Sequence, residues 1–281
     1  MKRFFALIFL LLLSCSYAEG RTSSSDLRVI SLYPGHSDNI AALGGQNILI
    51  ALSENDDADL LPMLPRLSMR DGAEKFLALK PGIVVTRSFA QRINPNLYEV
   101  LERAGVKIIS IDPPKWDNFE NYLMTLAEAL GLDAQPALKK LHDIKNSVAP
   151  SLKKKPYCFI EATSKEIHTC APGSWAANLI SLAGGINAAA EAKPLRNGSA
   201  VASWGAERVL KSHENKNLDI YIIQTGAMNN ATVKDFYSRE WTAALKGVKV
   251  YEVPERFLSR PSLTGLEKGL NILKKIITEE K

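Results

Sequence analysis

Short runs rich in valine and isoleucine alternate with amphipathic stretches along most of the chain. Such runs are typical of strands buried on both faces, because a parallel sheet is covered by helices on its two sides. We expect strands over residues 28–33, 48–53, 82–87, 107–112, 157–162, 168–171, 218–225 and 248–253. Helical spacing of apolar residues occupies 38–43, 73–79, 94–104, 176–183, 206–211 and 263–278. The alternation predicts an α/β fold with mainly parallel sheets.

The middle of the chain has a different pattern. Residues 117–148 contain no strand signal, and apolar residues recur at helical intervals over 119–130, where Gly131 is a typical helix end. A second helical pattern follows Asp133. Because helices separate two α/β patterns, we predict two Rossmann-like lobes joined by a long, rigid helical connection. The predicted boundaries are 27–114 for the N-terminal lobe, 115–150 for the connecting helices and 151–281 for the C-terminal lobe.

The first residues indicate export. Lys2 and Arg3 precede an apolar run over 4–13, which is too short to cross a bilayer and has the proportions of a secretory signal. Two processing sites compete, a lipobox in which Cys15 is lipidated and an ordinary small-residue site after Ala18. We predict a signal peptide over 1–18, a tether over 19–26, and a periplasmic protein that is either free or lipid-anchored through Cys15.

Composition and motifs narrow the function classes. The formal net charge of +5 is spread along the 281 residues, which does not suggest a nucleic-acid partner. The sequence has no Gly-x-Ser-x-Gly elbow, phosphate loop or His-Glu-x-x-His motif, so an α/β periplasmic enzyme is a disfavoured alternative. Four scattered histidines likewise disfavour a receptor for bare zinc or manganese. We expect a monomer with no intrinsic cofactor and no metal site.

Two cysteines follow the leader. Cys158 and Cys170 flank a segment that can turn back as a hairpin, which would place the two sulfurs opposite each other. In an exported chain this arrangement predicts one disulfide. Two reduced core cysteines and a metal site are the alternatives.

Several short motifs occur in the order and spacing of one known family. They lie at residues 28–34 with 38–44, 74–84, 101–107, 171–175, 182–187 and 260–262. In these motifs the chain resembles the periplasmic-binding proteins of iron-siderophore and vitamin B12 (cobalamin) importers, over nearly its whole length from Arg28. The resemblance implies the helical-backbone type of fold, with modest hinge motion and a ligand held between the lobes. It also implies an ABC permease, with its ATPase, as partner in the inner membrane.

The resemblance further implies what is carried and how it is delivered. The transported ligand is expected to be a ferric siderophore or cobalamin, with haem as the alternative within the family. One surface glutamate on each lobe docks to permease arginines in this family, and the matching residues are Glu74 and Glu207. Each also suits the first turn of a helix, where the dipole favours an acid.

Some candidate ligand contacts come from the predicted strand ends, because ligands of open α/β sheets lie beyond the carboxyl ends of the strands. Arg70 lies in the loop before the helical stretch at 73–79, and Arg260 lies in the C-terminal turn. Arginine forks pair with carboxylate, phosphate or catecholate oxygens, which favours an anionic ligand. A tyrosine with a histidine can ligate iron, and tryptophans can stack on a flat macrocycle. Each residue also has an ordinary role in packing or loop bracing. The candidates are Tyr33, His36, Arg70, Arg87, Trp175, Trp204, Gln224 and Arg260.

Overall fold

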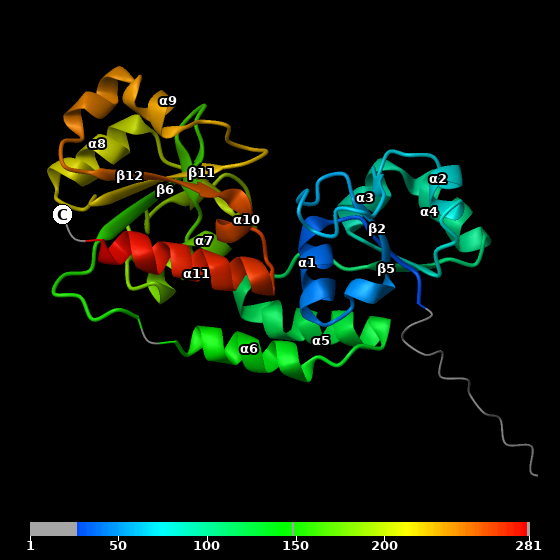
Figure 1. Ribbon diagram of the computed structural model, residues 1–281. Helices are drawn as coiled ribbons and strands as arrows, with labels where there is room; N and C mark the ends of the chain where they lie inside the picture. Colours follow the sequence, from blue (N-terminus) through cyan, green and yellow to red (C-terminus); the bar gives the residue numbers. More distant parts are fainter. Residues whose placement is uncertain (1–26, 148, 280–281) are drawn as a thin grey trace, which may run out of the picture.

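The computed structural model describes residues 27–147 and 149–279, so the predicted signal peptide and lipidation of Cys15 lie outside the described residues. The chain forms two lobes side by side (Figure 1). The N-terminal lobe holds a parallel sheet in the order β3-β2-β1-β4-β5. Its strands are β1 (Val29–Ser31), β2 (Leu49–Ser53), β3 (Arg66–Leu67), β4 (Ile83–Thr86) and β5 (Lys107–Ser110). Its helices are α1 (Pro34–Ala42), α2 (Ala73–Leu77), α3 (Ser88–Ile93) and α4 (Pro95–Arg103).

The C-terminal lobe holds a sheet in the order β12-β11-β6-β7-β10-β9, with β8 pairing to β6. The strands are β6 (Tyr157–Thr163), β7 (His168–Cys170), β8 (Ile186–Asn187), β9 (Lys193–Pro194), β10 (Val201–Ser203), β11 (Ile220–Thr225) and β12 (Lys249–Pro254). The helical segments are α7 (Trp175–Leu182), α8 (Ala206–Glu214), α9 (Val233–Tyr237), η4 (Glu240–Ala244), α10 (Glu255–Leu258) and α11 (Leu263–Thr278). This sheet is mixed, because β7, β9 and β10 run antiparallel to their neighbours.

The prediction of a Cys158–Cys170 disulfide is wrong. Both cysteines are free and buried. The predicted hairpin does form, but β6 pairs with β7 only near its end, where Glu161 lies opposite Thr169. The cross-strand partners of Cys158 are Asn187 of β8 and Ile220 of β11, so the two sulfurs are not on facing positions. Burial raises the pKa of the Cys158 thiol to about 12 and that of Cys170 to about 11, which makes both unreactive in the folded chain.

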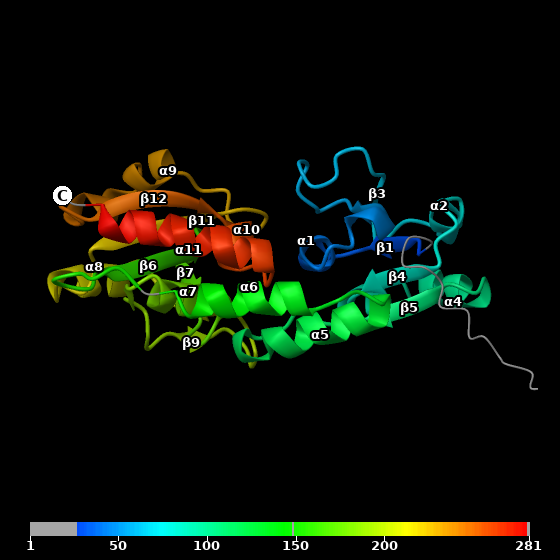
Figure 2. The same ribbon diagram turned by 60° about the horizontal axis from the view of Figure 1, so that its bottom comes forward.

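Two helices rather than one continuous helix connect the lobes. They are α5 (Phe119–Leu130), preceded by the short turn η3 (Trp116–Asn118), and α6 (Gln135–Lys145). Gly131 ends α5 in the left-handed conformation, as its sequence position predicts. Figure 2 shows both helices running along one side of the molecule, α5 under the N-terminal lobe and α6 beside α11.

One apolar core continues through the connection into both lobes. It includes Val29 of β1, Leu126 of α5, Leu179 of α7 and Leu273 of α11, all fully buried. The Asn39 amide adds a polar link, because it donates to the Pro261 carbonyl at 2.9 Å and accepts from the Leu263 amide at 3.0 Å. Within residues 27–147 and 149–279, no helix is long and apolar enough to cross a membrane.

Candidate functional site

A cleft of about 510 Å³ lies between the lobes at the carboxyl ends of their parallel strands. On the N-terminal side its wall includes Tyr33 after β1, Ser53 at the end of β2 and Arg87 after β4. On the other side it includes Thr225 at the end of β11 and Pro254 at the end of β12. Strand ends from both lobes therefore meet at one cleft, which is where the sequence predicts that the ligand binds. Figure 1 shows the loops after β2 and β11 on the sides of the two lobes that face each other.

Arg87 is the cleft cation without a carboxylate partner in the described part of the chain. Its guanidinium carbon lies 4.5 Å from the centre of the Tyr33 ring and 5.6 Å from that of Phe89. Its Nε atom is buried and has no acceptor among the described residues. Burial raises the pKa of the Tyr33 phenol, so this ring is neutral at ordinary pH. The two rings hold the guanidinium in the cleft wall, where it is ready to pair with an anion.

A network of ion pairs closes one end of the cleft and joins the two lobes. Asp57 accepts from Arg260 at 2.7 Å and lies 3.2 Å from Arg256. Arg260 also reaches Asp38 of α1 at 3.5 Å, and Arg256 reaches Asp59 at 3.3 Å. The aspartates belong to the N-terminal lobe and the arginines to the C-terminal lobe. Arg260 therefore lines the cleft as predicted, but its charge is already neutralised by carboxylates.

A buried ion pair positions the wall of the cleft that the C-terminal lobe forms. Glu161, at the end of β6, receives two hydrogen bonds from Arg239, at 2.5 and 3.0 Å, and one from the Tyr221 hydroxyl at 2.5 Å. The Asn229 amide also donates to Glu161. Asn229 closes a bridge with Gly226, whose backbone lines the cleft. The ion pair thus fixes the turn that follows β11.

His36 does not line the cleft, which corrects the prediction for this residue. It is fully buried in the first turn of α1, where its Nε2 donates to the Thr86 carbonyl at 3.2 Å. Its Nδ1 accepts from the Tyr122 hydroxyl at 2.7 Å. Burial lowers the pKa of His36 to about 4. A neutral ring with both nitrogens engaged has no position free for iron, so the expected Tyr33–His36 metal pair does not form.

The two candidate tryptophans are also outside the cleft. Trp175 is 5% exposed and packs edge-on against Trp116 and Phe119, with ring centres 4.9 Å apart in each pair. It therefore anchors α7 to the connecting segment. Trp204 lines a different cavity on the C-terminal lobe. Neither residue can stack on a ligand held between the lobes.

Gln224 and Arg70 lie next to the cleft without lining it. Gln224 is buried and accepts a 2.5 Å hydrogen bond from Ser259, which does line the cleft, so Gln224 is a positioning residue. Arg70 is exposed beside the lining residue Met69.

Glu74 and Glu207 occupy equivalent places on the two lobes. Each is the second residue of a helix, α2 or α8, and each is exposed. Neither forms an ion pair within the described ranges. Their positions suit both a docking contact and a favourable interaction with the helix dipole.

Sequence reasoning missed several charged residues of the cleft. Asp57 belongs to an acidic stretch directly after β2, and Glu255 and Arg256 directly follow β12. The rule that placed Tyr33 and Arg87 at strand ends, applied to these two strands as well, would have found all three.

Comparison with known proteins agrees with this architecture. Solved structures with the same fold include the periplasmic heme-binding protein RhuT from Roseiflexus sp. RS-1, with 19% identity, a TM-score of 0.67 and coverage of 90% of this chain and 99% of the other. The periplasmic heme-binding protein HutB of Vibrio cholerae has 16% identity, a TM-score of 0.67 and coverage of 89% and 99%. The periplasmic vitamin B12-binding protein BtuF of Vibrio cholerae has 23% identity, a TM-score of 0.57 and coverage of 90% and 98%.

None of the curated proteins compared with the sequence matches it. The model of the periplasmic binding protein family, however, matches residues 29–257, which is most of the chain and includes both lobes. The chain therefore belongs to the periplasmic binding protein family, whose members are solute-binding components of ABC importers.

Proposed function

We propose that the cleft captures an anionic iron complex, a ferric siderophore or haem, and that the protein delivers it to an ABC permease and its ATPase. The surroundings of Arg87 are the observation that carries this proposal. Its buried Nε without an acceptor, its contacts with the Tyr33 and Phe89 rings, and its position in the cleft wall together suit an anionic oxygen of a ligand.

The rim of the cleft suits a ligand with an apolar body. Phe89 is 46% exposed beside Arg87, and Met228 is 51% exposed in the turn after β11. Large exposed apolar side chains next to a charged cleft indicate a partner that combines apolar surface with a few acidic groups. The heme-binding proteins with this fold, RhuT and HutB, bind a ligand of that kind.

Cobalamin is the second candidate, and one observation favours it. BtuF, which binds vitamin B12, has the highest identity to this chain of the three structures compared above. The stacking argument for a corrinoid has lost its basis, however, because Trp175 and Trp204 lie outside the cleft. We therefore place the anionic iron complex first.

Titration with three ligands tests the proposal. Haem, a ferric catecholate siderophore and cyanocobalamin are added separately to the purified protein, and quenching of tryptophan fluorescence reports binding. We expect haem or the ferric siderophore to bind more tightly than cyanocobalamin.

The variant Arg87→Gln tests the role of this arginine. It should bind the preferred iron complex about tenfold more weakly or worse, because a charged hydrogen bond is lost. Arg70→Gln, which removes an exposed arginine beside the cleft, is the matched control and should bind as the unmodified protein does. Equal binding by Arg87→Gln would refute the role of Arg87.

We also propose that the protein is exported, with Cys15 either lipidated or removed by cleavage after Ala18. A basic start, a short apolar run and a small-residue exit support export. The intact mass of the mature protein distinguishes the two processing routes, since only lipidation retains Cys15 and adds acyl chains. A mature mass that still includes residues 1–14 would refute both processing routes.

A further inference from the structure

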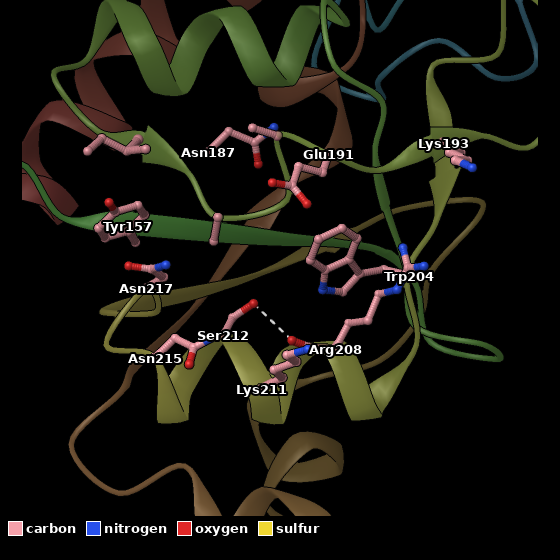
Figure 3. A pocket seen from close by; sticks show the side chains of 13 residues that line it. Tyr157, Asn187, Glu191, Lys193, Trp204, Arg208, Lys211, Ser212, Asn215 and Asn217 are labelled. Atoms are coloured by element: carbon pink, nitrogen blue, oxygen red, sulfur yellow. Dashed lines mark hydrogen bonds between the residues drawn. The ribbon is translucent and has the colours of Figure 1, made fainter.

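A second cavity lies on the C-terminal lobe, outside the cleft. Its volume of about 570 Å³ is comparable to that of the cleft. One side is formed by the segment around β8 and β9, and the other side by α8 and the turn that follows it (Figure 3). The indole ring of Trp204 stands between these two sides.

One end of this cavity is cationic. Arg208 lies at this end beside Trp204, Lys211 follows it on α8, and Lys193 lies on the β9 side of the cavity; Glu191 is the one acidic residue of the lining (Figure 3). Three cations against one carboxylate leave an excess of positive charge. Within the described residues, neither lysine side chain is engaged in an ion pair or hydrogen bond. Unpaired cations grouped in a cavity provide charge-assisted hydrogen bonds for a phosphate or carboxylate group.

Trp204 offers an unused donor beside these cations. Its Nε1 atom is buried and has no acceptor in the part of the chain that the structure describes. The guanidinium carbon of Arg208 lies 5.2 Å from the centre of the indole ring. Phe159 packs behind the ring, with centres 6.5 Å apart, which fixes its orientation. A buried N–H without an acceptor is unfavourable, and a ligand oxygen would satisfy it.

The opposite end of the cavity is neutral and polar. Figure 3 shows Asn215, Asn217 and Tyr157 there, with Asn187 above them. The Asn187 side-chain oxygen accepts from the Ala189 amide at 3.0 Å, which leaves its NH₂ group to donate. The side-chain amides of Asn215 and Asn217 have no hydrogen bond within the described ranges. Side-chain amides both donate and accept, so a group of them suits hydroxyl groups.

We propose that this cavity is a second ligand site, which binds a sugar phosphate with its phosphate beside Arg208 and Lys211 of α8 and its hydroxyls at the asparagine end. The two ends differ in the way that such a ligand does, and the edge of the Trp204 indole lies between them. The phosphate then lies near the middle of α8, away from the carboxyl end of the helix, where the dipole would repel it.

Calorimetric titration of the full chain with glucose 6-phosphate tests this site. Titration with glucose measures the binding of the sugar part alone, and titration with inorganic phosphate measures the binding of the phosphate group alone. We expect saturable binding of glucose 6-phosphate that is tighter than that of either fragment. The double variant Arg208→Gln/Lys211→Gln should bind it at least about tenfold more weakly. Trp204→Phe keeps an aromatic ring but removes the N–H and should also weaken binding.

The matched control is Arg92→Gln/Lys234→Gln, which removes the same two charges from exposed positions outside the cavity. It should bind glucose 6-phosphate as the unmodified protein does, and circular dichroism checks that all variants are folded. Three results would overturn the proposal: no saturable binding of glucose 6-phosphate, binding of inorganic phosphate or glucose that is equally tight, or an equal loss of affinity in the control. None of these results depends on what the cleft binds.

Discussion

The sequence predicted well which residues line the cleft where they directly follow a strand, and poorly where they lie in a helix. Tyr33 and Arg87 follow β1 and β4, and both line the cleft. His36 is only three residues beyond Tyr33, but the first turn of α1 directs it inward to Thr86 and Tyr122. Sequence spacing specifies the position along a helix, whereas the neighbouring elements decide which face is buried. The sequence alone therefore does not show that the side chains of His36 and Trp175 lie on buried helix faces.

Buried His36 predicts a pH dependence of stability. Its pKa falls from 6.5 in the unfolded chain to about 4 in the folded protein, so the unfolded state binds more protons between these values. The stability that the folded protein gains from keeping His36 neutral is therefore present above pH 6.5 and is lost as the pH falls towards 4. It amounts to about 3 kcal/mol in the free energy of unfolding. Burial raises the pKa of Asp56 to about 6, which acts in the opposite direction over much of this range.

A comparison with His36→Gln isolates the histidine from Asp56. Urea unfolding of both proteins from pH 7 to pH 4 gives the difference in their free energies of unfolding at each pH. We expect the advantage of the unmodified protein to shrink by about 3 kcal/mol on acidification. A difference that stays constant with pH would show that His36 titrates normally in the folded state.

At the scale of elements, runs of strand-forming residues decided which strands the sequence could predict. All eight predicted strands are present, because each contains a run of valine, isoleucine or other strand-forming residues. Strands β3, β8, β9 and β10 were missed. Each has only two or three residues, although β1 and β7, with three residues each, were predicted. The hairpin of β6 and β7 was predicted, but its register was not, and the register separates Cys158 from Cys170. Pairing partners depend on the whole sheet.

The buried Glu161–Arg239 pair predicts a large effect for a small substitution. Glu161→Gln leaves the Arg239 guanidinium partly buried without a carboxylate, which should lower the free energy of unfolding by about 3 kcal/mol. The matched control is Glu267→Gln, which breaks the exposed pair with Lys140 and should cost less than about 1 kcal/mol. Urea unfolding measures both. Similar effects of the two substitutions would contradict the importance of the buried pair.

At the scale of the whole molecule, the two lobes are joined in three ways. They share the core that passes through α5, the Asn39 amide bridges α1 to the start of α11, and the Asp57–Arg260 and Asp57–Arg256 pairs cross the end of the cleft. These links are consistent with the modest hinge motion that the sequence resemblance implies. The two-lobe plan followed from the order of patterns in the sequence. The ion pairs between lobes did not, because they join residues about 200 positions apart.

The placement of Glu74 and Glu207 on separate lobes predicts a separation of binding from uptake. Reversing both charges, with Glu74→Arg and Glu207→Arg, should abolish delivery to the permease, because charge complementarity guides docking. Ligand binding in the cleft should be unchanged. Uptake of the labelled iron complex and fluorescence titration measure the two steps. Glu102→Arg/Glu214→Arg, at exposed positions on the same lobes, is the control and should retain both. Normal uptake by the Glu74/Glu207 variant, or loss of ligand binding, would contradict the docking role.

Native mass spectrometry of the protein purified from its own periplasm tests the central claim most directly, because it weighs whatever the chain has captured. We expect one equivalent of an iron complex, identified as a ferric siderophore or haem by the mass of the released ligand. Arg87→Gln should carry less of it. A bare divalent ion bound in place of an organic complex would contradict the proposed function.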